Sequence, residues 1–408
     1  MEATLQTIFR SRFDSYKKHH GLSLDQYKAA QAIMDCQSEA LGYEKWECLE
    51  DGQTEELNHS CRHRSCPRCH GAQTHEWLEK MKSRLLPCDH FHTIFTLPHE
   101  LNALWQYNRA WCSDRLLKAS AETLKQLLAD EKYLGAEVGM LSALHTWGRT
   151  LSFHPHVHVL VSGGGRNGKE WKTVKNDFLL PVGVIRAKFQ GKWLTWLNEA
   201  YEAGEITLPP EWTESHWKKV LREIAKKKWN VRIQNGYRHG NGVATYLSRY
   251  MRGGPIKDHR IVSANDKTVN FRYRDHRDSF VKTLSITPEH FMSRVLWHVP
   301  IKGQHSIRYY GLYTASAVEK RQRVRKCLGV EEETKPILSE PPTRQCPKCG
   351  RPMFHRASVR SEISSIKSAA KNIKVRRPVQ QGVQPDPGEI LASRLKFSVN
   401  FFTLQGAG

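Results

Sequence analysis

No apolar run in the 408-residue sequence approaches the roughly 20 residues that a helix needs to cross a bilayer. The first residues, Met1-Glu-Ala-Thr-Leu-Gln-Thr7, also lack the charged and then apolar pattern of a secretory signal. We therefore expect a protein of the cytoplasm with no membrane partner. In that reducing compartment the 10 cysteines are better interpreted as metal ligands than as disulfides.

Acidic residues are scarce relative to basic ones. The chain has 63 Lys and Arg against 41 Asp and Glu, which gives a formal net charge of +22. A field of this sign attracts polyanions, and nucleic acid is the commonest of them; the alternative is a basic surface without such a partner. Hydrophobic residues make up only 39% of the chain, which is low but adequate for a core, and the length allows two or three domains.

The composition divides the chain into three parts. Residues 1–88 hold clustered cysteines and short helical stretches, one of which is predicted to begin after Ser23. Residues 89–318 alternate strand-like and helical runs, and residues 319–408 are basic, polar and expected to be partly disordered. Within the middle part the pattern predicts strands at 92–97, 138–147, 153–161 and 269–273, and helices at 101–128 and 243–251.

The sharpest local pattern is Leu151-Ser-Phe-His-Pro-His-Val-His-Val-Leu-Val161. Side chains alternate between the two faces of a strand, so His156 and His158 point the same way while the valines point to the other side. If the hairpin turns just before residue 151, His145 lies opposite His156, with Cβ atoms about 4.5–5.5 Å apart. These three imidazoles are then predicted to share a metal ion. A register slip would make His154 the third ligand, and a metal-free, histidine-rich strand is the alternative.

A second pattern is Val243-Ala-Thr-Tyr-Leu-Ser-Arg-Tyr-Met-Arg252, which places Tyr246 and Tyr250 on one face of a predicted helix. A phenol can attack a phosphodiester and conserve the bond energy as a phosphotyrosine, so no nucleotide cofactor is needed. Because free tyrosine has a pKa near 10, the reaction needs a metal to polarise the phosphate. Arg249 and Arg252 are placed to offset the developing charge. An aromatic packing stripe is the alternative, and the nearby histidine hairpin makes it less favoured.

Together these motifs resemble a known family. Thr-Leu-Pro98 after a strand, then His-Val-His158, then Tyr-x-x-x-Tyr250 is similar to the motif order of HUH endonucleases, in particular the two-tyrosine rolling-circle transposases of bacterial insertion sequences. The similarity covers roughly residues 30–315 and includes His298-Val-Pro and Ile307-Arg-Tyr-Tyr-Gly311. Replication initiators and relaxases share the chemistry and remain the alternative within the class.

The resemblance implies specific roles. His156 and His158 would bind Mg²⁺ or Mn²⁺, and Tyr246 and Tyr250 would take 5′-phosphates in successive transesterifications. The substrate would be single-stranded DNA at the ends of a mobile element, joined to target DNA by a protein associated with the bacterial nucleoid.

The N-terminal cysteines form a zinc-ligand pattern. Cys61-Arg-His-Arg-Ser-Cys66-Pro-Arg-Cys69 contains a Cys-x-x-Cys knuckle, and together with Cys48 its three cysteines suffice for one tetrahedral zinc ion. Cys36 is a further possible ligand, and a second ion remains open. Such a small segment needs metal to fold. The arginines expected to face DNA are Arg62, Arg64 and Arg68.

The cysteine cluster resembles the zinc-binding domain of the same transposases, whose pattern has a further cysteine near Asp51 that is absent here. Much later, Cys346-Pro-Lys-Cys349 is half of a zinc ribbon, for which Cys327 and His355 are candidate partners. A non-catalytic zinc-ribbon DNA-binding regulator would explain the charge and the cysteines but not the histidines and tyrosines.

The segment Gly163-Gly-Gly-Arg-Asn-Gly-Lys169 imitates a phosphate-binding loop, but Glu170 stands where a Ser or Thr should bind magnesium. We interpret it as a glycine-rich loop and expect no nucleotide cofactor. The sequence as a whole predicts an α+β fold of the HUH endonuclease type. A central antiparallel sheet is flanked by helices, preceded by a small zinc-binding domain and followed by a basic, partly disordered tail.

Overall fold

The computed structural model describes residues 2–237, 254–330 and 343–361. Its centre is a six-stranded sheet in which strands follow the order β11-β4-β5-β3-β7 and β6 pairs with β5. Every pairing in this sheet is antiparallel. The strands are β3 (His90–Thr96), β4 (Glu137–Trp147), β5 (Phe153–Asn167), β6 (Glu170–Thr173), β7 (Asn230–Tyr237) and β11 (Ile307–Gly311).

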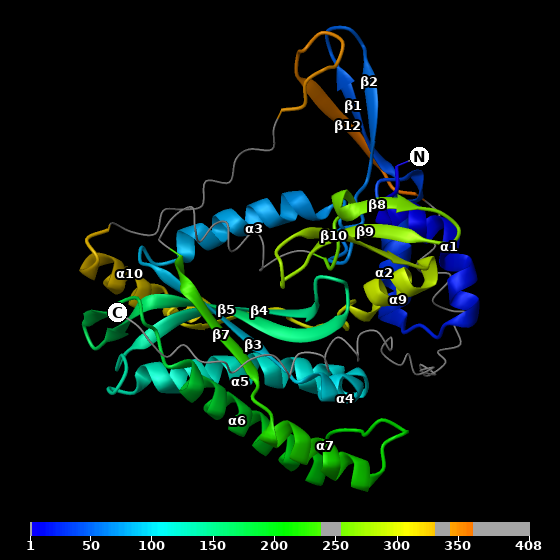
Figure 1. Cartoon of the computed structure of the whole chain (residues 1–408). Helices are drawn as coiled ribbons and strands as arrows, with labels where there is room; N and C mark the ends of the chain where they lie inside the picture. The colour runs from blue at the N-terminus through cyan, green and yellow to red at the C-terminus, as the bar shows by residue number, and fades with distance from the viewer. Residues whose placement is uncertain (1, 238–253, 331–342, 362–408) are drawn as a thin grey trace, which may run out of the picture.

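Helices cover both faces of the central sheet (Figure 1). Val157, Val159 and Val161 point to one face, as predicted from the alternation in β5, and join the largest core of the protein. The helices of that layer are α4 (Asn102–Tyr107), α5 (Arg109–Ala129), α6 (Val182–Glu202) and α7 (Glu214–Lys226). Leu160 points to the other face, where a smaller core joins it to α3 (His70–Arg84) and α10 (Val318–Cys327). The predicted α+β class with a central antiparallel sheet between helices is confirmed.

The N-terminal helices belong to a second core. Helices α1 (Leu5–His19) and α2 (Leu24–Asp35) each begin with a capping box, and the one at Ser23 and Gln26 is as predicted. Their apolar faces pack with α9 (Pro288–Trp297) and with the small sheet of β8 (Ile261–Ala264), β9 (Val269–Arg274) and β10 (Val281–Ile286). Residues 5–36 and the cysteine knuckle at residues 61–69 therefore share a core with residues 256–299. Short 3-10 helices lie at η1 (Glu39–Leu41), η2 (His99–Leu101), η3 (Asp258–Arg260) and η4 (Ala315–Ala317).

The turn between β4 and β5 connects the two cores. Leu151, which is fully buried, inserts into the N-terminal core with its backbone in the left-handed region at φ 62°. Arg260 donates a hydrogen bond to the carbonyl of Arg149 at 2.7 Å, and Arg294 donates one to the carbonyl of Thr150 at 2.9 Å. The end of the histidine hairpin is thus fixed by elements far away in the sequence.

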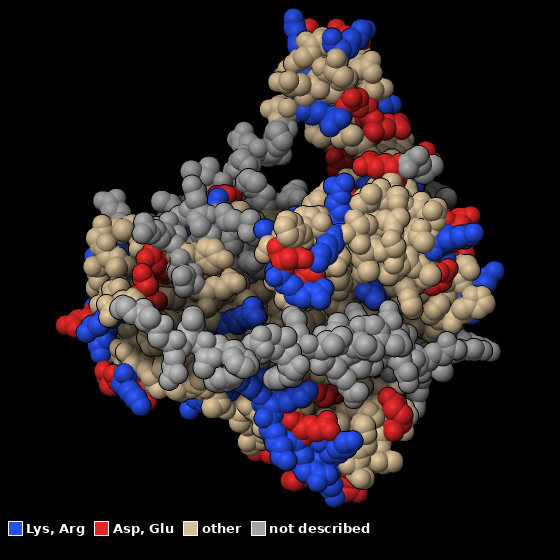
Figure 2. Space-filling model, in the orientation of Figure 1, with Lys and Arg blue, Asp and Glu red and all other residues tan. Residues whose placement is uncertain are grey.

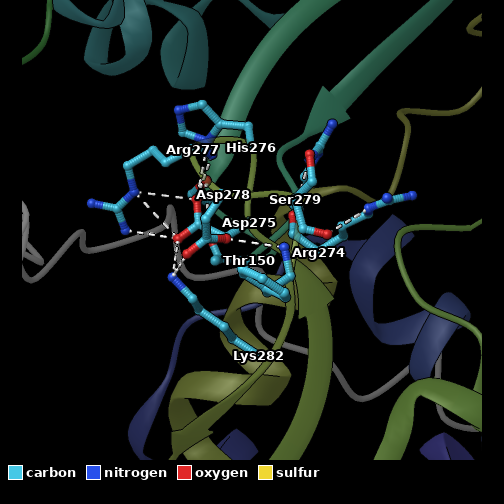
Figure 3. A network of polar contacts seen from close by, with 11 residues as sticks. Thr150, Arg274, Asp275, His276, Arg277, Asp278, Ser279 and Lys282 are labelled. Atoms are coloured by element: carbon cyan, nitrogen blue, oxygen red, sulfur yellow. Dashed lines mark hydrogen bonds and ion pairs between the residues drawn. The ribbon is translucent and has the colours of Figure 1, made fainter.

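The β9–β10 turn lies against the same hairpin end (Figure 3). The Asp275 side chain, only 3% exposed, pairs with Arg277 at 2.9 Å and with Lys282 at 2.8 Å. The hydrogen bonds from Arg277 and Lys282 hold the pKa of Asp275 below its ordinary value, so the carboxylate stays charged. Arg149 donates to the carbonyl of Arg274 at 3.0 Å, which joins this turn to the hairpin.

A three-stranded sheet projects from the body as an arm (Figure 1). It consists of β1 (Tyr43–Cys48) between β2 (Thr54–Asn58) and β12 (Met353–Val359), all antiparallel. β12 comes from the part predicted to be a disordered tail.

Two described segments depart from that expectation for the tail. β12 gains a full strand pairing with β1, and α10 buries Arg321 and Arg325 against the body. Arg325 donates to the carbonyls of Ser83 and Leu85, which satisfies the end of α3. The expected disorder otherwise concerns residues 331–342 and 362–408, which lie outside the described residues.

The glycine-rich segment that imitates a phosphate loop is part of a strand, which corrects our interpretation of it as a loop. Gly163–Asn167 continue β5, and residues 164–167 pair with β6. A Cβ on Gly164 would lie 2.5 Å from the Trp171 ring, so close packing of the two strands requires glycine there.

Among the described helices, none has the length and apolar character that spanning a membrane requires.

Candidate metal centres and nucleic-acid cavity

The histidine hairpin has the register that the sequence predicts. In the β4–β5 ladder His145 pairs directly with His156, and the strands end on either side of a turn at residues 148–152. His145, His156 and His158 each offer a nitrogen, and these atoms all lie within 4.8 Å of one another. The structure therefore brings the three predicted ligands together on the sheet face opposite the valine core.

The hydrogen bonds of the imidazoles leave two lone pairs facing each other. His156 donates from Nδ1 to the carbonyl of His154 at 2.7 Å, which leaves Nε2 as the acceptor nitrogen. The Nε2 atoms of His156 and His158 are 3.1 Å apart. Two acceptor nitrogens at this distance repel unless a cation lies between them, so the donor set fits a metal ion.

A second layer of side chains orients His158. Its Nδ1 lies 2.8 Å from Nε2 of His92, and Nδ1 of His92 lies 2.8 Å from Oε1 of Gln234. Because the amide oxygen only accepts, His92 donates to Gln234 and accepts from His158, which presents Nε2 of His158 to the metal position. This role of His92 was not predicted, because the sequence alone does not give the β3–β5 register that pairs His92 with Leu160 on the sheet face of His158.

Burial keeps the imidazoles neutral. It lowers the pKa of His156 and of His158 well below the usual value, and the neighbouring His145 lowers both further. Burial likewise lowers the pKa of His92 to about 4, although the bond to Gln234 opposes the shift. Neutral imidazole is the form that binds metal, so the site keeps its lone pairs at neutral pH.

His154, the substitute third ligand, is not part of this group. Its side chain is exposed, and its ring lies 5.3 Å from that of His156. Its backbone carbonyl instead accepts the hydrogen bond that fixes His156. The predicted register therefore selects His145 over His154.

A cavity of about 510 Å³ adjoins His145. Its walls combine aromatic rings with basic groups, and they include Trp77, Trp147, Tyr309, Arg64 and Arg109. The Trp147 ring stacks on His145 with centroids 4.4 Å apart, and the Trp77 indole donates to the Tyr309 hydroxyl at 3.2 Å. Aromatic faces beside guanidinium groups suit the bases and phosphates of a single nucleic-acid strand.

His298, from one of the segments that carry the family resemblance, forms part of the cavity wall. Its Nε2 donates to the carbonyl of Leu151 at 3.1 Å, and its Nδ1 accepts from the Thr146 hydroxyl at 3.1 Å. Burial lowers its pKa to about 3, against the opposing effect of the Leu151 bond. His298 thus holds β4 and the turn of the histidine hairpin together as a neutral ring.

The predicted nucleophiles and their arginines lie outside the described residues: Tyr246, Tyr250, Arg249 and Arg252. The described chain stops at Tyr237 and resumes at Gly254. The Tyr237 ring lies 6.2 Å from the His92 ring, and Gly254 lines the cavity beside His145. Both ends of the undescribed segment therefore lie near the histidine group.

The cysteines form two groups, which corrects the predicted ligand set. Cys36, Cys61, Cys66 and Cys69 lie with their sulfur atoms within 4.8 Å of one another, so Cys36 takes the place predicted for Cys48. Cys36 directly follows α2 and belongs to the N-terminal core, which carries it to the knuckle. Hydrogen bonds from the Cys61 and Cys66 thiols lower the pKa of Cys36 to about 2, while the Cys66 pKa rises to about 12. This group fits zinc, because a divalent ion offsets the charge of adjacent thiolates.

Cys48 lies instead with Asp51, Cys346 and Cys349. The two partners that the sequence suggested for the late Cys-x-x-Cys pair are elsewhere. The Cys327 thiol contacts the carbonyl of Lys169, and the His355 ring packs edge-on against Trp46.

The three arginines of the N-terminal knuckle are all exposed, but they differ in their contacts. Arg64 lines the cavity and donates to the carbonyl of Gln304 at 2.9 Å. Arg68 contacts the Gln6 amide oxygen, which directs it along α1. Arg62 has a left-handed backbone at φ 53°. Of the three, Arg64 is the one next to the histidine group.

Comparisons with known proteins agree with these features. Residues 139–322 match a family described as putative transposase, and residues 8–97 match a family described as transposase zinc-binding domain. A putative transposase of Sinorhizobium fredii is 33% identical over 363 residues, covering 87% of this chain and 90% of the relative. The transposase for insertion sequence element IS801 of Pseudomonas savastanoi is 30% identical over 311 residues, covering 71% of each chain.

One similar solved structure is the N-terminal nuclease domain of the minute virus of mice non-structural protein-1. The match covers 43% of this chain and 81% of the viral chain, at 14% identity. Its TM-score of 0.24 is too low to carry an argument. The two sequence relatives cover enough of the chain at sufficient identity to decide the family. The chain belongs to the IS91 family of rolling-circle transposases.

Proposed function

We propose that this transposase cuts and rejoins single-stranded DNA by metal-assisted attack of a tyrosine on a phosphodiester. The observation that carries the proposal is the group of three neutral imidazoles beside a basic, aromatic cavity. Its substrates would be the ends of a mobile element and a target strand, and its place in the cell would be the nucleoid.

The ion held by His145, His156 and His158 would act as a Lewis acid on the scissile phosphate. Of the two ions implied by the family resemblance, an all-imidazole set favours Mn²⁺ over Mg²⁺, since Mg²⁺ prefers oxygen ligands. His92 orients His158 for this role, and burial keeps the rings unprotonated.

The cavity would hold the DNA strand. Trp77, Trp147 and Tyr309 offer ring faces for unstacked bases, while Arg64 and Arg109 offer charge for the backbone. A paired base has its faces covered by its neighbours, so a cavity of this kind favours single-stranded DNA over duplex. Lys and Arg also gather over α7 (Figure 2), where Lys218, Lys219, Arg222, Lys226, Lys227 and Lys228 are exposed. This surface would attract the DNA outside the site.

Tyr246 and Tyr250 would be the nucleophiles. Each phenol oxygen would attack phosphorus and displace the 3′-oxygen, which leaves a 3′-hydroxyl and a 5′-phosphotyrosine. A 3′-hydroxyl of a second strand would then attack the phosphotyrosine and restore the phenol. The supporting observation is that the chain leaves and re-enters the described structure close to the histidine group, at Tyr237 and Gly254.

The test is covalent trapping of a labelled single strand from the element end. With Mn²⁺ the wild type should form an adduct that survives denaturation, Tyr246→Phe and Tyr250→Phe should each impair strand joining, and the double variant should form no adduct. Tyr107→Phe, a half-buried tyrosine at the end of α4, is the control. Undiminished adduct in the double variant would exclude these nucleophiles.

We further propose a division of labour along the chain. The zinc-binding part within residues 1–88 would recognise the element end, with Arg62, Arg64 and Arg68 near the DNA, and residues 89–318 would perform the chemistry.

A further inference from the structure

The second cysteine group lies in the projecting arm, away from the first. The Cys48 and Cys349 sulfurs are 3.5 Å apart, and the Cys346 sulfur is 3.4 Å from an Asp51 carboxylate oxygen. All four ligand atoms lie within 4.8 Å of one another. Ligands that share a tetrahedral zinc with Zn–S bonds of about 2.3 Å lie about 3.8 Å apart. The spacing of the group therefore matches that of a single bound ion.

The two loops that supply these ligands have the same backbone design. Gly52 donates to the carbonyl of Cys48 at 3.0 Å, and Gly350 donates to the carbonyl of Cys346 at 2.8 Å. Both glycines are left-handed, at φ 70° and 74°. Each loop is thus a knuckle with its ligands at the first and fourth positions, and Asp51 occupies in one knuckle the position that Cys349 occupies in the other.

A second hydrogen bond completes the equivalence. The Cys48 amide donates to the carbonyl of Gln53 at 2.8 Å, and the Cys346 amide donates to the carbonyl of Arg351 at 2.7 Å. The Gln53 amide in turn donates to the Asp51 carboxylate at 2.9 Å, which holds the carboxylate toward the sulfurs. The position of Asp51 follows from the fold of its loop.

The arm has almost no hydrophobic core. Its buried cluster consists of Cys48, Cys346 and Met353, with Trp46 packed against them. So small a cluster cannot offset the entropy of ordering three strands, and structural metals supply this free energy in other small units. Cys48 and Cys349 are 301 positions apart in the sequence, so an ion here would close a very long loop.

We propose that Cys48, Asp51, Cys346 and Cys349 form a second zinc site, which fastens the C-terminal segment 343–361 to the β1–β2 hairpin. It is independent of the Cys36 group and of the histidine group. Its carboxylate carries the same charge as a thiolate but is a harder ligand, which binds zinc less strongly. The arm ion therefore exchanges faster than the ion of the Cys36 group.

Zinc counting on the full-length protein tests the site. A thiol-specific mercurial releases zinc from cysteine ligands and leaves histidine-held metal in place, and a dye measures the released zinc. The wild type should release two ions per chain, and Cys346→Ser/Cys349→Ser should release one. Cys327→Ser, which changes an exposed cysteine outside both groups, is the matched control and should release two. One ion from the wild type, or two from the double variant, would overturn the proposal.

A second variant keeps the test valid if the double variant fails to fold. Asp51→Cys completes a four-thiolate set, so the faster of two zinc-release phases should slow at least 10-fold in excess chelator while the zinc count stays at two. When cobalt replaces zinc, the intensity of the thiolate-to-metal charge-transfer band reports the number of thiolate ligands. It should rise from the value for the seven cysteines of the two groups toward the value for eight. Unchanged release and an unchanged band would contradict Asp51 as a ligand. A Cys48–Cys349 disulfide found under reducing conditions would also contradict the site.

Discussion

The histidine group and the Cys36 group differ in what holds their ligands in place. The histidines stand on two paired strands whose reverse face packs into the largest core of the protein. The Cys36 group is built from the end of one helix and a loop that pack against the N-terminal core, and its four sulfur atoms lie within 4.8 Å of one another. The first group is therefore formed by the fold before any ion binds, whereas the second depends on its ion for its shape.

This difference predicts two responses to metal loss. Removing the ion from the histidine group should abolish chemistry and leave folding almost unchanged, because the strands remain packed. Removing zinc from the cysteine groups should loosen the structure, since adjacent thiolates repel without a cation. The predictions below test the contrast, from the largest expected effect to the smallest.

His156→Ala should reduce strand cleavage by about 1,000-fold or more, because the ion supplies several kcal/mol of transition-state stabilisation. DNA binding and the melting temperature should change little, since His156 lies on the half-buried ligand face and not in the valine core. Cleavage, binding by fluorescence anisotropy and thermal melting are measured on one preparation. If DNA binding or the melting temperature fell together with cleavage, the histidine group would also support the fold, and the contrast with the Cys36 group would be wrong.

Cys61→Ser should have the opposite signature, a large loss of stability together with the loss of one zinc ion. Structural zinc contributes apparent free energies of about 10–16 kcal/mol in small modules, so the N-terminal part should become protease-sensitive at temperatures where the wild type resists. Limited proteolysis and zinc content measure the effect, with Cys327→Ser as the control outside both cysteine groups. A variant that keeps full zinc and resistance would contradict the assignment of Cys61.

His92→Ala should weaken metal binding by about 10–100-fold, since it removes the acceptor that orients His158. Cleavage at saturating Mn²⁺ should recover most of its rate, which distinguishes a positioning residue from a ligand. The measurement is cleavage rate against Mn²⁺ concentration. If excess metal restores nothing, His92 acts in another way.

Leu151→Ala should cost about 2–5 kcal/mol of unfolding free energy, the usual range for truncating a fully buried leucine. Because Leu151 ties the hairpin turn to the N-terminal core, the loss should include a broader unfolding transition. Urea denaturation measures both quantities. A loss well below 1 kcal/mol would show that the two cores are not connected through this side chain.

His154→Ala should change cleavage and Mn²⁺ affinity least. The exposed ring is outside the ligand group, and the backbone carbonyl that holds His156 is retained. The cleavage rate measured against Mn²⁺ concentration, as for His92→Ala, gives both quantities. A loss comparable to that of His145→Ala would mean that the register in solution differs from the one described.

The sequence predicted those features that depend on local periodicity. Alternation in β5, the capping box at Ser23 and the pairing of His145 with His156 follow from neighbours within a few residues, and all are confirmed. The exchange of Cys36 for Cys48 was not predictable in this way. It depends on β12, which returns across about 300 residues to pair with β1 and brings a second Cys-x-x-Cys knuckle to Cys48.

The roles of Gln234 and His298 depend on contacts between distant segments. Gln234 bonds to His92 only when β7 pairs with β3, and His298 bonds to the hairpin turn only when the end of α9 packs against it. The glycines of β5 imitate a loop in sequence but are selected by strand contacts with β6.

Electron paramagnetic resonance of bound Mn²⁺, on zinc-loaded full-length protein, tests the central claim most directly. The account predicts one tight Mn²⁺ ion per chain in the wild type and in His154→Ala, and its loss in His145→Ala and in His156→Ala. Tight Mn²⁺ binding that persists in both of the latter variants would show that the catalytic ion is held somewhere else.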